Sequence, residues 1–160
     1  MRASGQQDPA YISTDTVSEG AVFRPHGRIA IYRDHEFLMY EAVGPFNDEM
    51  AEALAKAQAA SLAALQFVGP WSSIATFRAS ILATPNAIEG YKRLMAAPKP
   101  PGWTPAATAF VCDPNLEGLY ILKPKLYDIY SHIGRPLEFF TNLEDAKSWC
   151  RKIMRSGTCT

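Results

Sequence analysis

A hydroxyl residue stands where the sequence predicts the start of a helix. Thr84 follows a predicted strand, residues 71–82, and precedes Pro85. A hydroxyl there can cap the helix or accept a phosphate, because the free N–H groups and the positive end of the helix dipole favour negative charge. Pro85 at the first helical position fits ordinary capping, so we interpret Thr84 as an N-cap and keep phosphorylation as the alternative. Ser80 is a weaker phosphate acceptor, and Asn86 would lie on the same partner-facing surface.

A cysteine nucleophile is the second chemistry that the residue types allow. Cys112 closes a predicted strand at residues 106–113, and the carboxyl ends of strands in open α/β sheets are common ligand sites. A thiol nucleophile needs a base within hydrogen-bond reach, and His132 on the next predicted helix could serve. A free cysteine in a strand is more typical of packing.

Other catalytic and metal patterns are missing from the sequence. It contains no GxGxxG, P-loop, GxSxG or HExxH motif. The three histidines, His26, His35 and His132, lie in different predicted elements, and no cysteine–histidine cluster has zinc spacing. We therefore expect no metal and no cofactor.

Aromatic residues suggest a binding slot. Helices that lie on a sheet can leave an apolar space between the two layers. Phe110, Tyr127 and Tyr130 could line such a slot for a lipid-like or other apolar ligand. Aromatic residues at helical spacing are more often simply part of the core, and that interpretation stays open.

Composition narrows the class of protein. The 160 residues are 48% apolar and 20% charged, and 16 basic side chains balance 16 acidic ones. A zero net charge argues against binding to nucleic acid or to a membrane surface by bulk electrostatics. The N-terminus has no apolar signal region, and no stretch approaches the roughly 20 apolar residues that span a bilayer. We expect a cytoplasmic protein without a membrane span.

The first half of the chain predicts a hairpin and then a helix. Residues 1–26 are polar with little periodicity, so we expect a flexible N-terminal arm. Residues 28–34 and 36–44 favour two strands joined by a hairpin. Apolar residues then recur every three or four positions as far as Leu65, which predicts an amphipathic helix with Asn47 as its N-cap.

The second half alternates helices and strands. A helix over residues 85–97 is followed by a proline-rich loop at 98–105. The next helix is expected to begin at Pro124 and to end at Gly134. Residues 137–140 predict a short strand. Thr141 and Glu144 then form a capping box for the last helix.

Strands and helices in this order indicate an α/β fold. Four strands separated by helices predict a mostly parallel sheet, and the opening hairpin adds an antiparallel edge. We therefore expect a single-layer mixed sheet of five strands with about four helices. One domain would occupy residues 27–155, with residues 156–160 as a tail.

Two phrases resemble a known family. "GRIAIYRDHEFLMYEAVGPF" and "YSHIGRPLEFFTNLEDAKSWC" resemble the STAS-like group, specifically the SpoIIAA-like family of bacterial proteins, over roughly residues 27–155. The anti-sigma-factor antagonists of this fold carry a Ser or Thr that a partner kinase phosphorylates at the helix after the third strand. The matching segment here is Ala83-Thr84-Pro85-Asn86, in which only the hydroxyl is retained.

These observations leave three functional hypotheses. The resemblance implies a non-enzymatic STAS-like regulatory module that presents the surface around Thr84 to an unidentified protein partner, as a degenerate switch of the anti-sigma-antagonist type. The alternative is a module that binds a small or lipid-like molecule in the slot between sheet and helices. An enzyme that uses Cys112 is the third. The edge strand of the opening hairpin could also pair two copies into a homodimer.

Overall fold

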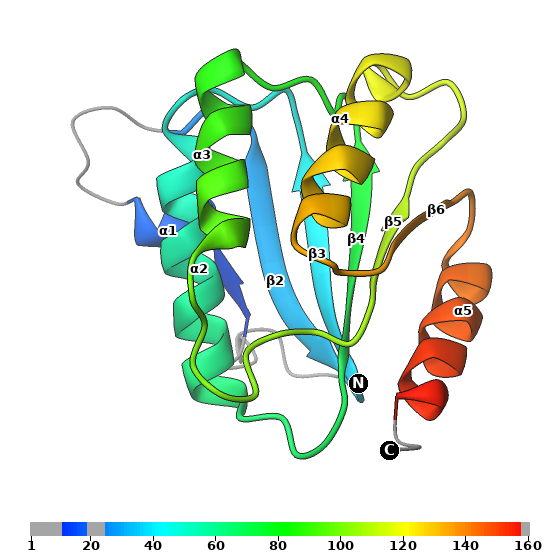
Figure 1. Cartoon of the computed structure of the whole chain (residues 1–160). Coiled ribbons are helices and arrows are strands. Elements are labelled where there is room, and N and C mark those ends of the chain that lie inside the picture. Colours follow the sequence, from blue (N-terminus) through cyan, green and yellow to red (C-terminus); the bar gives the residue numbers. More distant parts are fainter. Residues whose placement is uncertain (1–10, 19–24, 158–160) are drawn as a thin grey trace, which may run out of the picture.

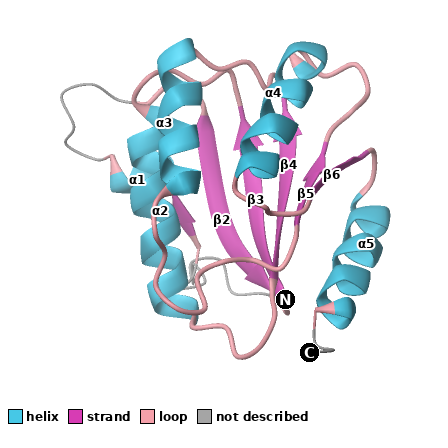
Figure 2. Cartoon of the chain, in the orientation of Figure 1, coloured by secondary structure: helices cyan, strands magenta, loops and turns pink. Residues whose placement is uncertain are grey.

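The computed structural model describes residues 11–18 and 25–157. Within them, six strands form one sheet in the order β1-β2-β3-β4-β5-β6 (Figures 1 and 2). The strands are β1 (Ile12–Ser13), β2 (Arg28–Asp34), β3 (Phe37–Val43), β4 (Ser72–Arg78), β5 (Thr108–Val111) and β6 (Leu137–Phe140). The helices are α1 (Thr14–Val17), α2 (Met50–Leu65), α3 (Pro85–Ala96), α4 (Leu119–His132) and α5 (Leu143–Ser156).

The sheet has an antiparallel half and a parallel half. β1, β2 and β3 pair antiparallel, whereas β3 to β6 pair parallel. Parallel neighbours in sequence order are joined by right-handed crossovers, which place the connecting helices on one face. Figure 1 shows α3 and α4 over this face, and α2 packs beside α3. The predicted mixed α/β sheet is confirmed.

The opposite face is covered by α5. Phe37, Ile74 and Ala109 lie on this face and pack against Ala146 and Cys150 of α5. Since side chains alternate along a strand, their neighbours in β4 and β5 face the other helices. The sheet therefore lies between a layer that contains α2, α3 and α4, with the short α1 against α2, and the single helix α5.

The predicted strand count is wrong, because part of the predicted arm is folded. Ile12 and Ser13 pair with β2, and the hydroxyl of the fully buried Thr14 accepts a hydrogen bond from the Ile29 N–H at 3.0 Å. The short helix α1 follows. The predicted hairpin is confirmed, but β1 covers part of its outer strand, so the hairpin is not the edge of the sheet. Residues 25–26 of the predicted arm are also described and precede β2. Residues 1–10 and 19–24 of the arm lie outside the described residues.

Two predicted caps are wrong. α2 begins at Met50, and the backbone carbonyl of Asn47 accepts from the Met50 N–H at 3.1 Å, so Asn47 lies in a turn before the helix. α5 is capped by Asn142 rather than by Thr141, because the Asn142 side chain accepts from the Asp145 N–H at 2.9 Å. A shift of one residue keeps the cap chemistry of α5, whereas Glu49, the residue at the N-cap of α2, makes no side-chain cap hydrogen bond.

The predicted start of the helix that ends at Gly134 is also wrong, whereas its predicted end is confirmed. α4 begins at Leu119 and contains Pro124. Pro124 is exposed, and the buried Leu122 in the preceding turn packs into the core, which favours the helical turn despite the missing N–H. Gly134 follows the helix with a φ of 66°, a left-handed conformation that glycine adopts without steric cost.

The C-terminal boundary is close to the predicted one. α5 continues through Ser156, the first residue of the predicted tail, and residues 158–160 lie outside the described part of the chain. Among the described residues, no helix is both long enough and apolar enough to cross a bilayer.

We expect Thr14→Val to destabilise the protein by about 1–3 kcal/mol, because the buried Ile29 N–H would lose its acceptor. The free energy of unfolding in urea measures this cost. Thr104→Val, at an exposed threonine, is the matched control and should change little. Equal stability of the two variants would contradict the docking of this segment onto β2.

Candidate functional site

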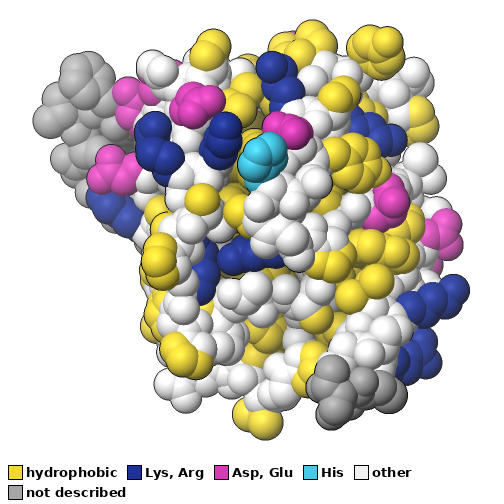
Figure 3. Space-filling view, in the orientation of Figure 1, with side chains coloured by type: hydrophobic (Ala, Val, Ile, Leu, Met, Phe, Trp, Pro, Cys, Tyr) yellow, Lys and Arg dark blue, Asp and Glu magenta, His cyan; other side chains and the backbone are white. Residues whose placement is uncertain are grey.

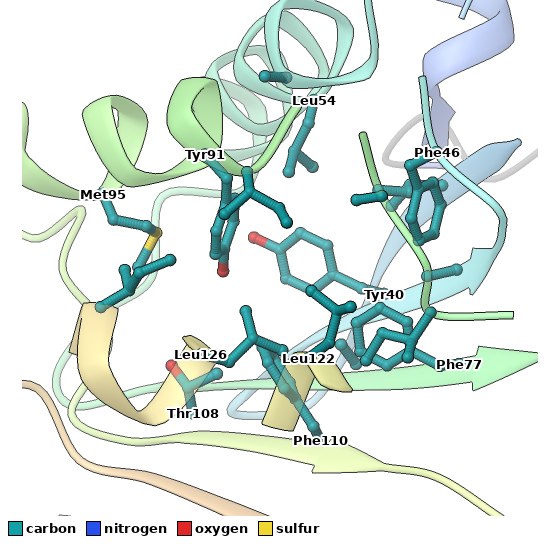
Figure 4. A pocket seen from close by; sticks show the side chains of 18 of the residues that line it. Tyr40, Phe46, Leu54, Phe77, Tyr91, Met95, Thr108, Phe110, Leu122 and Leu126 are labelled. Atoms are coloured by element: carbon teal, nitrogen blue, oxygen red, sulfur yellow. The ribbon is translucent and has the colours of Figure 1, made fainter. Parts of the chain in front are cut away.

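A cavity of about 130 Å³ lies between the sheet and helices α2, α3 and α4 (Figure 4). Its floor includes a row of paired residues, Tyr40 of β3, Ala75 of β4 and Phe110 of β5. Ser73 lies two residues before Ala75 on β4 and faces the same side of the sheet. Ala75 lies between the aromatic Tyr40 and Phe110, and Ser73 lies between Leu38 and Thr108. The space that these two small side chains of β4 do not fill is part of the cavity.

Close helix packing forms part of the roof. α2 and α3 approach so closely at Gly90 that a Cβ atom there would lie 2.7 Å from the Cβ of Ala51. Such a distance is shorter than real contacts between carbon atoms. Leu54 of α2 and Met95 of α3 line the cavity, and Figure 4 shows both above the sheet.

Three tyrosines bring hydroxyl groups to this apolar space. The hydroxyls of Tyr91 on α3 and Tyr130 on α4 are 2.6 Å apart and join the two helices. Figure 4 shows the hydroxyls of Tyr40 and Tyr91 directed into the cavity. Burial is the main cause that raises the pKa of each of the three phenols. They are therefore neutral hydroxyl groups at physiological pH and can donate hydrogen bonds to a ligand.

One end of the cavity is positively charged. Arg135 lines this end, and Lys125 of α4 also belongs to the cavity lining. Two hydrogen bonds of a Schellman turn fix the backbone of Arg135: its N–H donates to the Tyr130 carbonyl at 3.0 Å, and that of Gly134 donates to the Ser131 carbonyl at 3.1 Å. Figure 3 shows Lys and Arg side chains over α3 and α4, with hydrophobic side chains between them.

The cavity lining offers hydroxyls and cations but no acid–base pair. Among the described residues that line it there is no Asp, Glu, His or Cys. The described part of the chain also contains no group of three or more potential ligands that could hold a metal ion. The arrangement can bind and orient a molecule.

The predicted aromatic slot coincides with this cavity in two of its three residues. Phe110 and Tyr130 line it, but Tyr127 does not. Tyr127 lies on another side of α4, where its ring is tilted against that of Phe139 with the centroids 5.2 Å apart, and its hydroxyl donates to the Glu138 carboxylate. Helical spacing alone did not decide which tyrosine faces inward.

Sequence reasoning missed Tyr40, Tyr91 and Arg135. The alternation along residues 37–43 places Tyr40 on the same face as Leu38 and Ala42, which was a signal that could have been used. Tyr91 lies at helical spacing from Ile88 and Met95 within the predicted helix at residues 85–97. No local pattern marks Arg135 as part of a site, because its place depends on contacts with the strands.

Thr84 is the N-cap of α3, as its sequence position indicated. Its hydroxyl accepts from the Ala87 N–H at 3.1 Å and donates to the Asp48 carboxylate. Asn86 donates to the other oxygen of Asp48 at 3.0 Å. These bonds hold the pKa of Asp48 below its usual value, the Thr84 bond most strongly. A phosphate on Thr84 would meet the Asp48 charge, which opposes the predicted modification.

Ser80 is not on the partner-facing surface. It lies beyond the end of β4 and is only 1% exposed. Its hydroxyl accepts from the Leu82 N–H at 3.0 Å and donates to the Glu117 carbonyl at 3.4 Å. A kinase cannot reach this hydroxyl in the folded protein.

The structure separates Cys112 from His132. Cys112 is buried beyond the end of β5, near Lys123 in the first turns of α4. His132 is exposed at the other end of α4, where it lies 3.7 Å from Asp128. The length of the helix puts about 20 Å between its two ends, so the two residues do not form a nucleophile–base pair. Burial raises the pKa of the Cys112 thiol to about 11.

Three comparisons with known proteins gave no match: no family model, no curated protein and no solved structure is significantly similar to this chain. The functional argument therefore depends on the geometry of the chain itself.

We expect Thr84→Ala to lower the free energy of unfolding by roughly 1 kcal/mol, because the first turn of α3 loses its cap. Thr84→Ser keeps the hydroxyl and should retain most of the stability. Urea denaturation of the two variants beside the wild type measures the difference. The capping role would be wrong if the alanine variant matched the serine variant.

We expect Cys112 to react slowly with iodoacetamide at neutral pH, at least about a hundredfold below an unfolded reference peptide, because little thiolate is present at a pKa of about 11. The rate should rise roughly tenfold per pH unit as long as the protein stays folded. Peptide mapping assigns the label to each cysteine. Cys150, whose pKa burial also raises to about 11, provides an internal comparison. Rapid, selective labelling of Cys112 at neutral pH would restore the enzyme hypothesis.

Proposed function

We propose that this protein binds a small, largely apolar molecule in the cavity between the sheet and helices α2, α3 and α4. The observation that supports this most strongly is the presence of three tyrosine hydroxyls, from Tyr40, Tyr91 and Tyr130, in a mostly apolar hollow. Well-formed apolar pockets with a few convergent polar groups are typical ligand sites. A purely structural core would be expected to fill this space with side chains.

The size of the cavity limits the ligand. An engineered protein cavity of about 150 Å³ with an apolar lining takes up benzene. The volume of about 130 Å³ found here is similar. The part of the ligand that lies inside the cavity is therefore about the size of one six-membered ring, or of a short alkyl chain. A ligand with a long acyl chain would have to extend beyond this space.

The chemistry supports binding rather than catalysis. The phenols are neutral and lie among apolar side chains, and the cations at one end are not paired with a carboxylate from the lining. A STAS-like regulatory role and a protein partner at the Thr84 surface stay predictions from the sequence. The polar contacts of Thr84 are satisfied within the protein, so this surface gives less support to a function than the cavity does.

We expect 4-methylphenol to bind and to raise Tm. At ten times its Kd, the stabilisation is about 1.4 kcal/mol, which corresponds to roughly 3–6 °C for a chain of this size. Its ring fits the volume of the cavity, and its hydroxyl can bond to the tyrosines. Calorimetric titration gives the Kd, and a thermal melt gives the shift.

Ala75→Leu should abolish this binding, because the added side chain fills the floor of the cavity. Ala63→Leu, at an exposed position of α2, is the matched control. If Ala75→Leu does not fold, Ala42→Leu tests the same space from β3. No binding to the wild type, or binding that the filling variants leave intact, would contradict the proposal.

A further inference from the structure

Among the residues that the structure describes, the side chain of Arg135 has no ion-pair or hydrogen-bond partner. Arg28, Arg78 and Arg151 each form an ion pair with a carboxylate. Arg135 is partly buried, yet it forms no ion pair and no side-chain hydrogen bond with any residue that the structure describes. A guanidinium that is partly removed from water without a partner is costly. It is therefore a candidate for binding an external anion.

A second cation lies close to Arg135. The ammonium of Lys99 donates to the carbonyls of Leu94 and, at 3.0 Å, of Ala97, at the end of α3. Burial first, and then the positive charge of Arg135, lower the pKa of Lys99. Neither cation has a carboxylate within ion-pair distance among residues 11–18 and 25–157. The potential at this end of the cavity favours an anion.

Helix dipoles supply an alternative reason for these charges. α3 and α4 both end near this place, and the C-terminal end of a helix carries partial negative charge. Lys99 is explained in this way, because it bonds to the last carbonyls of α3. Arg135 is not, because its guanidinium bonds to no described carbonyl and lines the cavity instead.

The hydroxyl pair lies within the electrostatic range of the same guanidinium. The positive charge of Arg135 acts on both Tyr91 and Tyr130. Only one phenolic proton is used in the 2.6 Å bond between these two hydroxyls. Tyr130 also has the Thr108 hydroxyl as a hydrogen-bond partner, and because that hydroxyl can itself donate, the second phenolic proton can still be donated to a ligand. A planar guanidinium and a hydroxyl are the donors that a carboxylate accepts best.

We propose that the ligand of this cavity carries a carboxylate, bound by Arg135 together with the Tyr91–Tyr130 hydroxyl pair, on an apolar body of about six to eight carbon atoms. This inference depends on the binding function proposed above. The apolar body would lie over Ala75 and Phe110, where the lining has no charge. The charged group would stay at the end of the cavity where Arg135 and Lys99 lie.

The test compares three molecules of similar shape and different charge: phenylacetate, phenylacetamide and phenethylamine. We expect phenylacetate to bind at least tenfold more tightly than phenylacetamide, and phenethylamine to bind most weakly. Calorimetric titration at low and high salt measures each Kd. The advantage of phenylacetate should decrease as salt screens the charges.

Arg135→Met keeps the length of the side chain and removes its charge. We expect this variant to bind phenylacetate at least tenfold more weakly than the wild type does, with the affinity that phenylacetamide has. Its affinity for phenylacetamide should be unchanged. Arg93→Met, at an exposed arginine of α3 outside this lining, is the matched control and should bind as the wild type does. If Arg135→Met does not fold, Arg135→Glu tests the same point, because it should prefer phenethylamine over phenylacetate.

The outcomes separate the two proposals. Equal affinity of the wild type for phenylacetate and phenylacetamide would overturn the carboxylate inference and leave the binding function intact. An unchanged preference in Arg135→Met would overturn the role of this arginine. If none of the three molecules binds, and 4-methylphenol does not bind either, both proposals are wrong.

Discussion

The distance between the sheet and its helices depends on side chains of unequal size on neighbouring strands. On one face, β4 presents Ala75 between Tyr40 of β3 and Phe110 of β5, and the small Ser73 two residues earlier. The aromatic neighbours hold the helices away, and the small residues leave the hollow. On the other face, the fully buried Ile74 of the same strand packs under α5. The two faces of one strand therefore produce a cavity on one side and a filled core on the other.

Two sets of hydrogen bonds hold the helices over this cavity. At one edge, Asp48 accepts from Thr84 and Asn86, which links the segment before α2 to the start of α3. Further along α3, the bond between Tyr91 and Tyr130 links it to α4. The first set gives the Thr84 hydroxyl a structural role, whereas the second also faces the cavity. The hydrogen bonds to Asp48 therefore act only within the protein, whereas the tyrosine hydroxyls can also bind a ligand.

The polar end of the cavity lies at the amino-terminal edge of the parallel strands. Arg135 lies two residues before the start of β6, and Thr108 is the first residue of β5. In open α/β sheets, ligands more often bind beyond the carboxyl ends of the strands. Here the side of the cavity toward that edge is lined by Phe46 and Phe77, whose rings meet edge to face with centroids 6.4 Å apart. The charges and hydroxyls are therefore at the opposite edge.

The sequence by itself determined the class of the fold, because strand and helix periods are local properties. Alternation over residues 28–44 gave the hairpin, and Thr84-Pro85 gave the start of α3. Contacts between distant segments decided the rest. The Thr14 hydroxyl accepts a hydrogen bond from the Ile29 N–H of β2, and no sequence pattern around either residue predicts this contact. The cavity likewise depends on the summed sizes of side chains from several strands and helices. The charge of Arg135 is unpaired within the described part of the chain because the fold brings none of its carboxylates within ion-pair distance.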